Sequence, residues 1–216
     1  MKVLSSKLLF IFLFFIVLSI DSYSQCLSRG GGGRGGNSNF SIELGAGVPI
    51  PITPSNDIKF GDAKKGELGL RYLPQGGNLG IRGYYAYMGI SDSGATPSDH
   101  GNSLKVHRVE LQGIYMLDDL LGVANGSIFE LESYLGAGAG LGKPSSASGS
   151  NKMLAATIGL RPRFLIDNNR LHVYVDTSYG MLFNQRYDYA GEYIPGTSKG
   201  NMESALQISV GLSYRL

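Results

Sequence analysis

Apolar and polar residues alternate with a period of two along most of the chain after residue 39. Successive side chains of a β-strand point to opposite faces of the sheet, so this period predicts strands. Eight such segments occupy residues 40–48, 67–72, 79–87, 108–117, 129–141, 154–164, 171–183 and 206–216. In the last segment Leu206, Ile208 and Val210 share one face, while Gln207 and Ser209 lie on the other. The pattern predicts an all-β protein with eight strands.

The charged residues of these segments all lie on the polar faces, and they balance. The polar faces carry six acids and six arginines: Glu43, Glu67, Arg71, Arg82, Arg108, Glu110, Glu130, Glu132, Arg161, Arg163, Asp176 and Arg215. Charges removed from water require partners with good hydrogen-bond geometry. The planar guanidinium of arginine suits such sites, because it can bind a carboxylate through two donors. We therefore expect the polar faces to meet in an interior charge network.

Alternation alone does not say which face lies inside the barrel. A soluble eight-stranded barrel such as a lipocalin would place the polar face outward, and its exterior should carry many lysines. No lysine occurs among the twelve charges. Six tyrosines also lie on the apolar face, several near segment ends, where interfacial girdles of membrane barrels form: Tyr72, Tyr85, Tyr87, Tyr115, Tyr179 and Tyr214. These features favour an eight-stranded antiparallel up-and-down transmembrane β-barrel in the cell outer membrane.

The connections between the segments alternate in length. Residues 74–77, 118–127 and 167–170 are short links, whereas the other connections are longer and rich in Gly, Pro, Ser and Asp: 49–63, 92–103, 143–152 and 185–202. Short periplasmic turns and longer extracellular loops are typical of outer-membrane barrels. Proline lacks the N–H of a strand ladder, so we expect a bulge or a missing bond at Pro162.

The N-terminal region differs from the rest of the chain. Two lysines precede an apolar run over residues 8–18, which is too short for the roughly 20 residues of a transmembrane helix. Residues 1–24 are therefore expected to form a secretory signal peptide. Residues 25–38 are expected to be a flexible Gly-rich segment, and residues 39–216 the barrel. Cys26 is not preceded by a lipobox, so we do not expect lipid modification.

Composition and spacing exclude several function classes. With 32 Gly, one Cys and a net charge of +2, the chain lacks a disulfide framework and a basic footprint for nucleic acid. The run GAGAGLGK at residues 136–143 lacks the Ser or Thr of a phosphate loop. His172 and Ser178 share a strand face but stand about 20 Å apart by strand rise. We therefore expect no catalytic, metal-binding or cofactor-binding residues, no cofactor, and no enzymatic activity.

Several segments resemble a known family when taken in order. FSIELGAGVPIPITP at 40–54, GELGLRY at 66–72 and RVELQGIYML at 108–117 are followed by YLGAGAG at 134–140 and IGLRP at 158–162. Together they resemble the N-terminal barrel of OmpA-type porins from Bacteroidota. The resemblance implies a barrel-only member, without the peptidoglycan-binding domain that often follows. It also implies a C-terminal signal for the barrel-assembly machinery at Ser209, Gly211, Tyr214 and Leu216, although an aromatic residue is usual in place of Leu216.

The function expected from this pattern is that of an integral outer-membrane barrel with a structural or surface-interaction role. Its interior is expected to be filled by the Arg/Glu network, so that it is not an open pore. A small-solute porin and a barrel enzyme acting on lipid A are the alternatives. The expected partners are outer-membrane lipid, the barrel-assembly machinery during insertion, and a protein bound through extracellular loops that carry Tyr187, Tyr189 and Tyr193.

Overall fold

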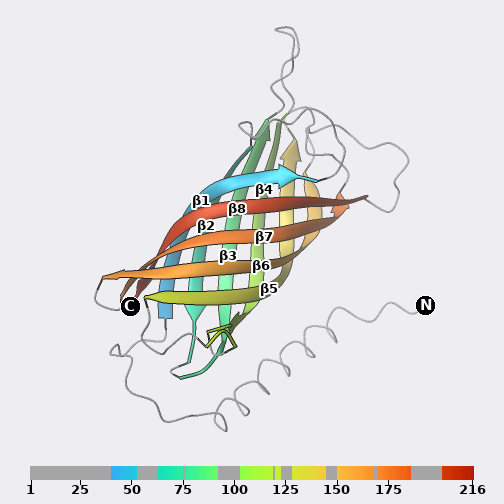
Figure 1. Cartoon of the computed structure of the whole chain (residues 1–216). Coiled ribbons are helices and arrows are strands. Elements are labelled where there is room, and N and C mark those ends of the chain that lie inside the picture. Colours follow the sequence, from blue (N-terminus) through green and yellow to red (C-terminus); the bar gives the residue numbers. More distant parts are fainter. Residues whose placement is uncertain are drawn as a thin grey trace, which may run out of the picture.

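The fold is a closed barrel of eight antiparallel strands (Figure 1). The computed structural model describes residues 40–52, 63–74, 76–91, 103–118, 120–122, 128–144, 150–167, 170–185 and 201–216. The strands are β1 (Phe40–Pro51), β2 (Ala63–Tyr72), β3 (Leu79–Ser91), β4 (Ser103–Met116), β5 (Phe129–Pro144), β6 (Asn151–Asp167), β7 (Leu171–Gln185) and β8 (Asn201–Arg215). The predicted all-β, eight-stranded, up-and-down topology is confirmed. The predicted signal peptide, the Gly-rich segment and the three loop tyrosines lie outside the described residues.

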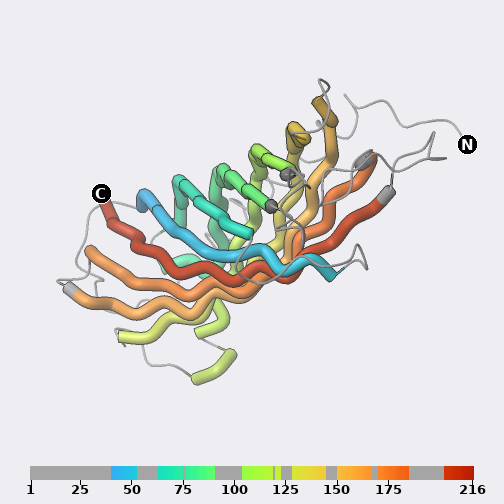
Figure 2. The backbone as a smooth tube through the Cα atoms, turned by 90° about the horizontal axis from the view of Figure 1, so that it is seen from above, coloured from blue at the N-terminus to red at the C-terminus, as the bar shows by residue number. Residues whose placement is uncertain are grey.

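The first and last strands close the barrel by pairing with each other. Their register runs from Ser41↔Arg215 to Pro51↔Ala205, and blue β1 follows red β8 along its length in Figure 2. At one end the amide of Leu216 donates to the carbonyl of Phe40 at 3.0 Å. Closure leaves no strand edge exposed for pairing with another chain. This end of the barrel is called the terminal end below, and the opposite end the loop end.

Burial alternates along the strands and identifies the interior face. Arg71 and Arg163 are each 1% exposed and Glu130 is 6% exposed, whereas Val109 and Leu135 are more than 60% exposed. Charged side chains thus point into the barrel and aliphatic side chains point away from it. This is the predicted orientation, and it is the reverse of that of a soluble barrel.

The lengths of the connections differ in part from the prediction. β5 continues to Pro144 and β6 begins at Asn151, so the connection at the loop end is shorter than the predicted 143–152. At the terminal end, residues 117–128 link β4 to β5 and form one of the longer connections. Part of it is a turn, in which the amide of Leu121 donates to the carbonyl of Leu117 at 3.1 Å. The expected contrast between short and long connections is therefore weaker than predicted.

Pro162 interrupts one of its two ladders, as expected. The β6–β7 register passes from Leu160↔Thr177 to Arg163↔Tyr174 without a pair at Pro162. On the other side of β6, Pro162 stays in register with Leu131 of β5. The missing N–H therefore affects one neighbour and leaves the barrel closed.

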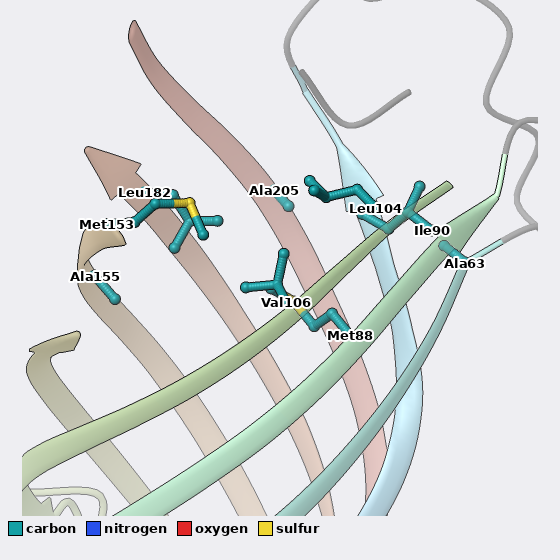
Figure 3. Packing of buried hydrophobic residues seen from close by; sticks show 9 residues of the cluster. All are labelled: Ala63, Met88, Ile90, Leu104, Val106, Met153, Ala155, Leu182 and Ala205. Carbon is teal, nitrogen blue, oxygen red and sulfur yellow. The ribbon is translucent and has the colours of Figure 1, made fainter. Parts of the chain in front are cut away.

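The interior at the loop end contains an apolar cluster beside buried Asn151 and Glu203, and the sequence pattern did not indicate this cluster. Nine buried residues form one cluster there: Ala63, Met88, Ile90, Leu104, Val106, Met153, Ala155, Leu182 and Ala205. Figure 3 shows them on strands around the barrel wall. Among the residues that the structure describes, no helix is long and apolar enough to cross a membrane, and this finding does not bear on crossing by strands.

Candidate functional site

The predicted charge network is present in the barrel interior. Eleven of its twelve members are buried: Glu43, Glu67, Arg71, Arg82, Arg108, Glu110, Glu130, Glu132, Arg161, Arg163 and Asp176. The twelfth, Arg215, is half-buried near the end of β8. The members come from most strands of the barrel, so their contacts show how the lumen is occupied.

Glu43 of β1 lies at the centre of the network. Its Oε2 accepts hydrogen bonds from Nη1 of Arg82 at 3.2 Å and from Nη1 of Arg161 at 2.5 Å. Its Oε1 accepts one from Nη1 of Arg163 at 2.9 Å. Arg82 belongs to β3, and the other two arginines belong to β6. Neither of these strands neighbours β1 in the barrel, so these ion pairs cross the lumen.

Glu132 of β5 is a second centre and shares arginines with Glu43. Nη1 of Arg82 lies 2.7 Å from its Oε1, while Nε of Arg71 lies 3.1 Å and Nη1 of Arg163 lies 3.3 Å from its Oε2. These two carboxylates thus bind four guanidinium groups across the barrel axis and share two of them, those of Arg82 and Arg163. Each shared arginine contacts both carboxylates through its Nη1, so two strands on opposite sides of the barrel are joined by buried, paired charges.

Three interior tyrosines complete the network, although they were not among its predicted members. The hydroxyl groups of Tyr84 and Tyr174 donate to Glu67 at 2.8 and 2.9 Å. The hydroxyl group of Tyr134 lies 2.8 Å from Asp176, which also accepts a hydrogen bond from Nε of Arg161 at 2.9 Å. All three tyrosines belong to the polar faces of their segments, and each hydroxyl group is a hydrogen-bond donor.

The same rings stack on arginine side chains. The guanidinium carbon of Arg161 lies 4.2 Å from the ring centre of Tyr174, and that of Arg82 lies 4.5 Å from the ring centre of Tyr134. Both distances are within the range of cation–π attraction. Arginine and tyrosine side chains therefore stack on one another in the interior.

Two glycines on the interior face make room for these rings. A Cβ atom at Gly211 would collide with the ring of Tyr174 and with the carbonyl oxygen of Leu44. A Cβ atom at Gly159 would lie 2.5 Å from the ring of Tyr134. At these two positions, the absence of a side chain allows the interior tyrosine rings to pack closely against the strands.

A second group of polar contacts surrounds Glu110 of β4. Nε of Arg108 lies 2.9 Å from its carboxylate, and the side chains of Thr157 and Gln112 each donate to it at 2.8 Å. Nη2 of Arg108 in turn donates to Gln207 of β8 at 3.1 Å. These contacts connect β4 with β6 through Thr157 and with β8 through Gln207.

One interior cation, Lys65, is not among the predicted network residues. Nζ of Lys65 is buried and lies 2.8 Å from Glu67 and 3.1 Å from the hydroxyl group of Ser209. Glu203 is also buried. Both residues belong to strand ends that lie beyond the alternating segments, because β2 begins at Ala63 and β8 at Asn201.

The prediction that the outward faces carry no charge holds only for the alternating segments. The longer strands of the structure place four exposed lysines on the outside of the barrel: Lys64, Lys105, Lys143 and Lys152. All four lie toward the loop end, at the start of β2, β4 and β6 or at the end of β5. The outward surface thus has an apolar belt with a basic margin.

The residues of the predicted assembly signal occupy both faces of β8. Ser209 is buried and contacts Lys65, and Gly211 packs under Tyr174. Tyr214 and Leu216 are about half exposed on the outward face. Outward aromatic and aliphatic groups at the strand end are compatible with recognition from outside the barrel, and the signal itself stays a prediction.

The interior histidine belongs to the charge network. Nε2 of His172 lies 3.9 Å from Oε2 of Glu130. Among the described residues, no three His, Cys, Asp or Glu side chains are grouped so that they could hold a metal ion.

Solved structures with the same fold include outer-membrane barrels. Neisserial surface protein A is 12% identical, with a TM-score of 0.51 over 83% of this chain and 98% of that one. A major outer membrane protein from Thermus thermophilus is 16% identical, with a TM-score of 0.50 over 84% of this chain and all of the other. No family model and no curated protein sequence matches the chain. The likeness shows the eight-stranded barrel fold, and the resemblance to OmpA-type porins of Bacteroidota stays a prediction.

Proposed function

We propose that the protein is an integral outer-membrane β-barrel with a structural or surface-interaction role and no open channel. The observation that carries this proposal is the combination of an apolar exterior with an interior crossed by ion pairs. Exposed Leu and Val side chains at mid-strand suit hydrocarbon. The interior carboxylates and guanidinium groups that cross the axis neutralise one another.

The occupied lumen argues against a small-solute porin. Glu43 and Glu132 connect strands on opposite sides of the barrel through shared arginines. The apolar cluster lines the interior at the loop end. A hydrated solute would have to break buried ion pairs and displace packed side chains to pass.

The interior chemistry also favours a role without catalysis. The carboxylates that could act as bases are held by arginine, lysine or tyrosine, as Asp176 is by Arg161 and Tyr134. General acid–base chemistry needs a group that a substrate can reach. The alternative of an enzyme acting on lipid A is tested by mass analysis of lipid A from a deletion strain, which we expect to be unchanged.

Fractionation tests the proposed location. We expect the protein to stay in the membrane pellet after carbonate washing and to change its gel mobility on heating, as stable membrane barrels do. Release by carbonate without a mobility shift would contradict the proposal.

Planar-bilayer recording tests the closed lumen. We expect no stable conductance from the reconstituted protein, because the ion pairs span the axis. A reproducible large channel would contradict the filled interior and favour the porin alternative. Partners in this proposal are outer-membrane lipid, the barrel-assembly machinery during insertion, and a protein bound through the extracellular loops.

A further inference from the structure

Exposed lysines form a row across one wall of the barrel at the loop end. Lys64 of β2 is paired with Gly89 of β3, and Gly89 is paired in turn with Lys105 of β4. Lys105 is paired with Lys143 of β5. The four residues therefore lie side by side on the outward face of adjacent strands. We call this set the lysine row.

The lysine row is a like-charge arrangement without a counter-ion among the described residues beside it. Like charges directly opposite each other on neighbouring strands are destabilising, and Lys105 and Lys143 are such a pair. Among the described residues, the next outward positions along β2 to β5 are Gly66, Tyr87, His107 and Leu141. None of these is acidic. An anion from outside the chain would neutralise these neighbouring ammonium groups.

Gly89 leaves a gap in the middle of the row. It has no side chain, and lysines stand on both sides of it. The hydroxyl group of Tyr87 lies 3.3 Å from the position that a Cβ atom of Gly89 would occupy. A phosphate placed over Gly89 would thus meet two ammonium groups and one hydroxyl donor.

An apolar groove lies farther along the same wall, toward the middle of the barrel. It has a volume of about 450 Å³, and its outward lining is Ile42, Leu68, Leu70, Gly83, Tyr85 and Val109. A Cβ atom at Gly83 would meet nothing within 4 Å, so the groove is open there. Val109 is four residues from Lys105 on β4, which is about 13 Å along a strand.

We propose that this wall binds a phosphorylated lipid of the outer leaflet, with its phosphate at the lysine row and an acyl chain in the groove over Gly83. The inference rests on the proposed outer-membrane location, with the loop end on the extracellular side. Charge complementarity selects a phosphorylated headgroup, and the apolar groove below it selects a lipid over a free phosphate. Tyr85 of the groove is joined by a hydrogen bond of 2.8 Å to His107, which occupies the next outward position on β4 after Lys105.

The test is a titration of the purified, folded barrel with diphosphorylated lipid A, followed by native mass spectrometry. The same lipid A after removal of its phosphates is the comparison ligand. We expect Lys105→Gln to weaken binding of the phosphorylated form about fivefold, the effect typical of one basic residue at an anionic membrane surface. Binding of the dephosphorylated form should not change, and Lys105→Arg should bind like the original protein.

Arg170→Gln is the matched control, because it removes one exposed positive charge at the terminal end. We expect it to leave binding unchanged. Gly83→Phe fills the groove and should weaken binding of both forms of lipid A. Heat-dependent gel mobility establishes that each variant is folded.

Two results would overturn the inference: equal affinity for the two forms of lipid A, or equal effects of Lys105→Gln and Arg170→Gln. Either result would leave the membrane location intact, since carbonate extraction tests that location independently. Release of the protein from membranes by carbonate would instead refute the proposed function itself.

Discussion

Replacement of Arg161 by leucine is the sharpest test of the interior network. This side chain pairs with Glu43 through Nη1 and with Asp176 through Nε at 2.9 Å, and its Nη2 lies 3.6 Å from Glu67. It also stacks on Tyr174. The substitution therefore removes one cation from three buried carboxylates at once.

The three carboxylates differ in what they retain after the substitution. Glu43 keeps Arg82 and Arg163, and Glu67 keeps Lys65. Asp176 keeps the hydroxyl group of Tyr134, which is a weaker partner than a cation. Removing one partner of a buried ion pair costs about 3–5 kcal/mol. Leucine recovers part of the packing, so we expect a loss at the lower end of this range.

Urea unfolding in lipid vesicles, followed by heat-dependent gel mobility, measures this loss. With a denaturant slope of about 1–3 kcal/mol per M, a loss of about 3 kcal/mol lowers the midpoint by about 1 M or more. Arg170→Leu removes an exposed arginine and should change stability by no more than about 0.5 kcal/mol. In the double variant Arg161→Leu/Asp176→Leu, part of the stability should return, because no unpaired Asp176 is left. Equal midpoints for Arg161→Leu and Arg170→Leu would refute the filled, ion-paired interior.

Three further substitutions test the two faces of the barrel by the same unfolding assay. Gly211→Ala should cost about 1–3 kcal/mol through overpacking against Tyr174, whereas Gly83→Ala faces open space and should be nearly neutral. Equal effects of the two would contradict the tight lumen. Leu135→Arg puts a charge in the apolar belt and should cost about 2–4 kcal/mol, and a neutral outcome in vesicles would argue against lipid contact at that residue.

Much of the barrel could be predicted from the sequence, because alternation carries the information directly. In the middle of each strand, apolar residues point outward and polar or small residues point inward, as at Leu135 beside Gly136 or Leu160 beside Arg161. Equal numbers of acidic residues and arginines on one face then implied that these residues pair inside the narrow interior of an eight-stranded barrel. The individual partners were not predictable, because the ion pairs of Glu43 depend on how strands that are not neighbours face each other across the axis.

The strand ends toward the loops were predicted less well, for a physical reason. There the interior becomes apolar, so Met88 and Ile90 point inward although their hydrophobicity matches the outward face. The outward face becomes basic at the same level, as at Lys105 and Lys143. Period-two reasoning assigns faces by hydrophobicity, so it ended the strands early and missed both the apolar cluster and the lysine row.

The direction of the side chains relative to lipid is the central claim, and one pair of variants measures it most directly. The chain has no Trp, so Leu135→Trp and Tyr134→Trp each introduce a single fluorophore at adjacent residues on opposite faces of β5. In vesicles with brominated acyl chains, we predict strong quenching at residue 135 and little at residue 134. Stronger quenching at residue 134, or equal quenching at both, would contradict an apolar exterior in contact with lipid.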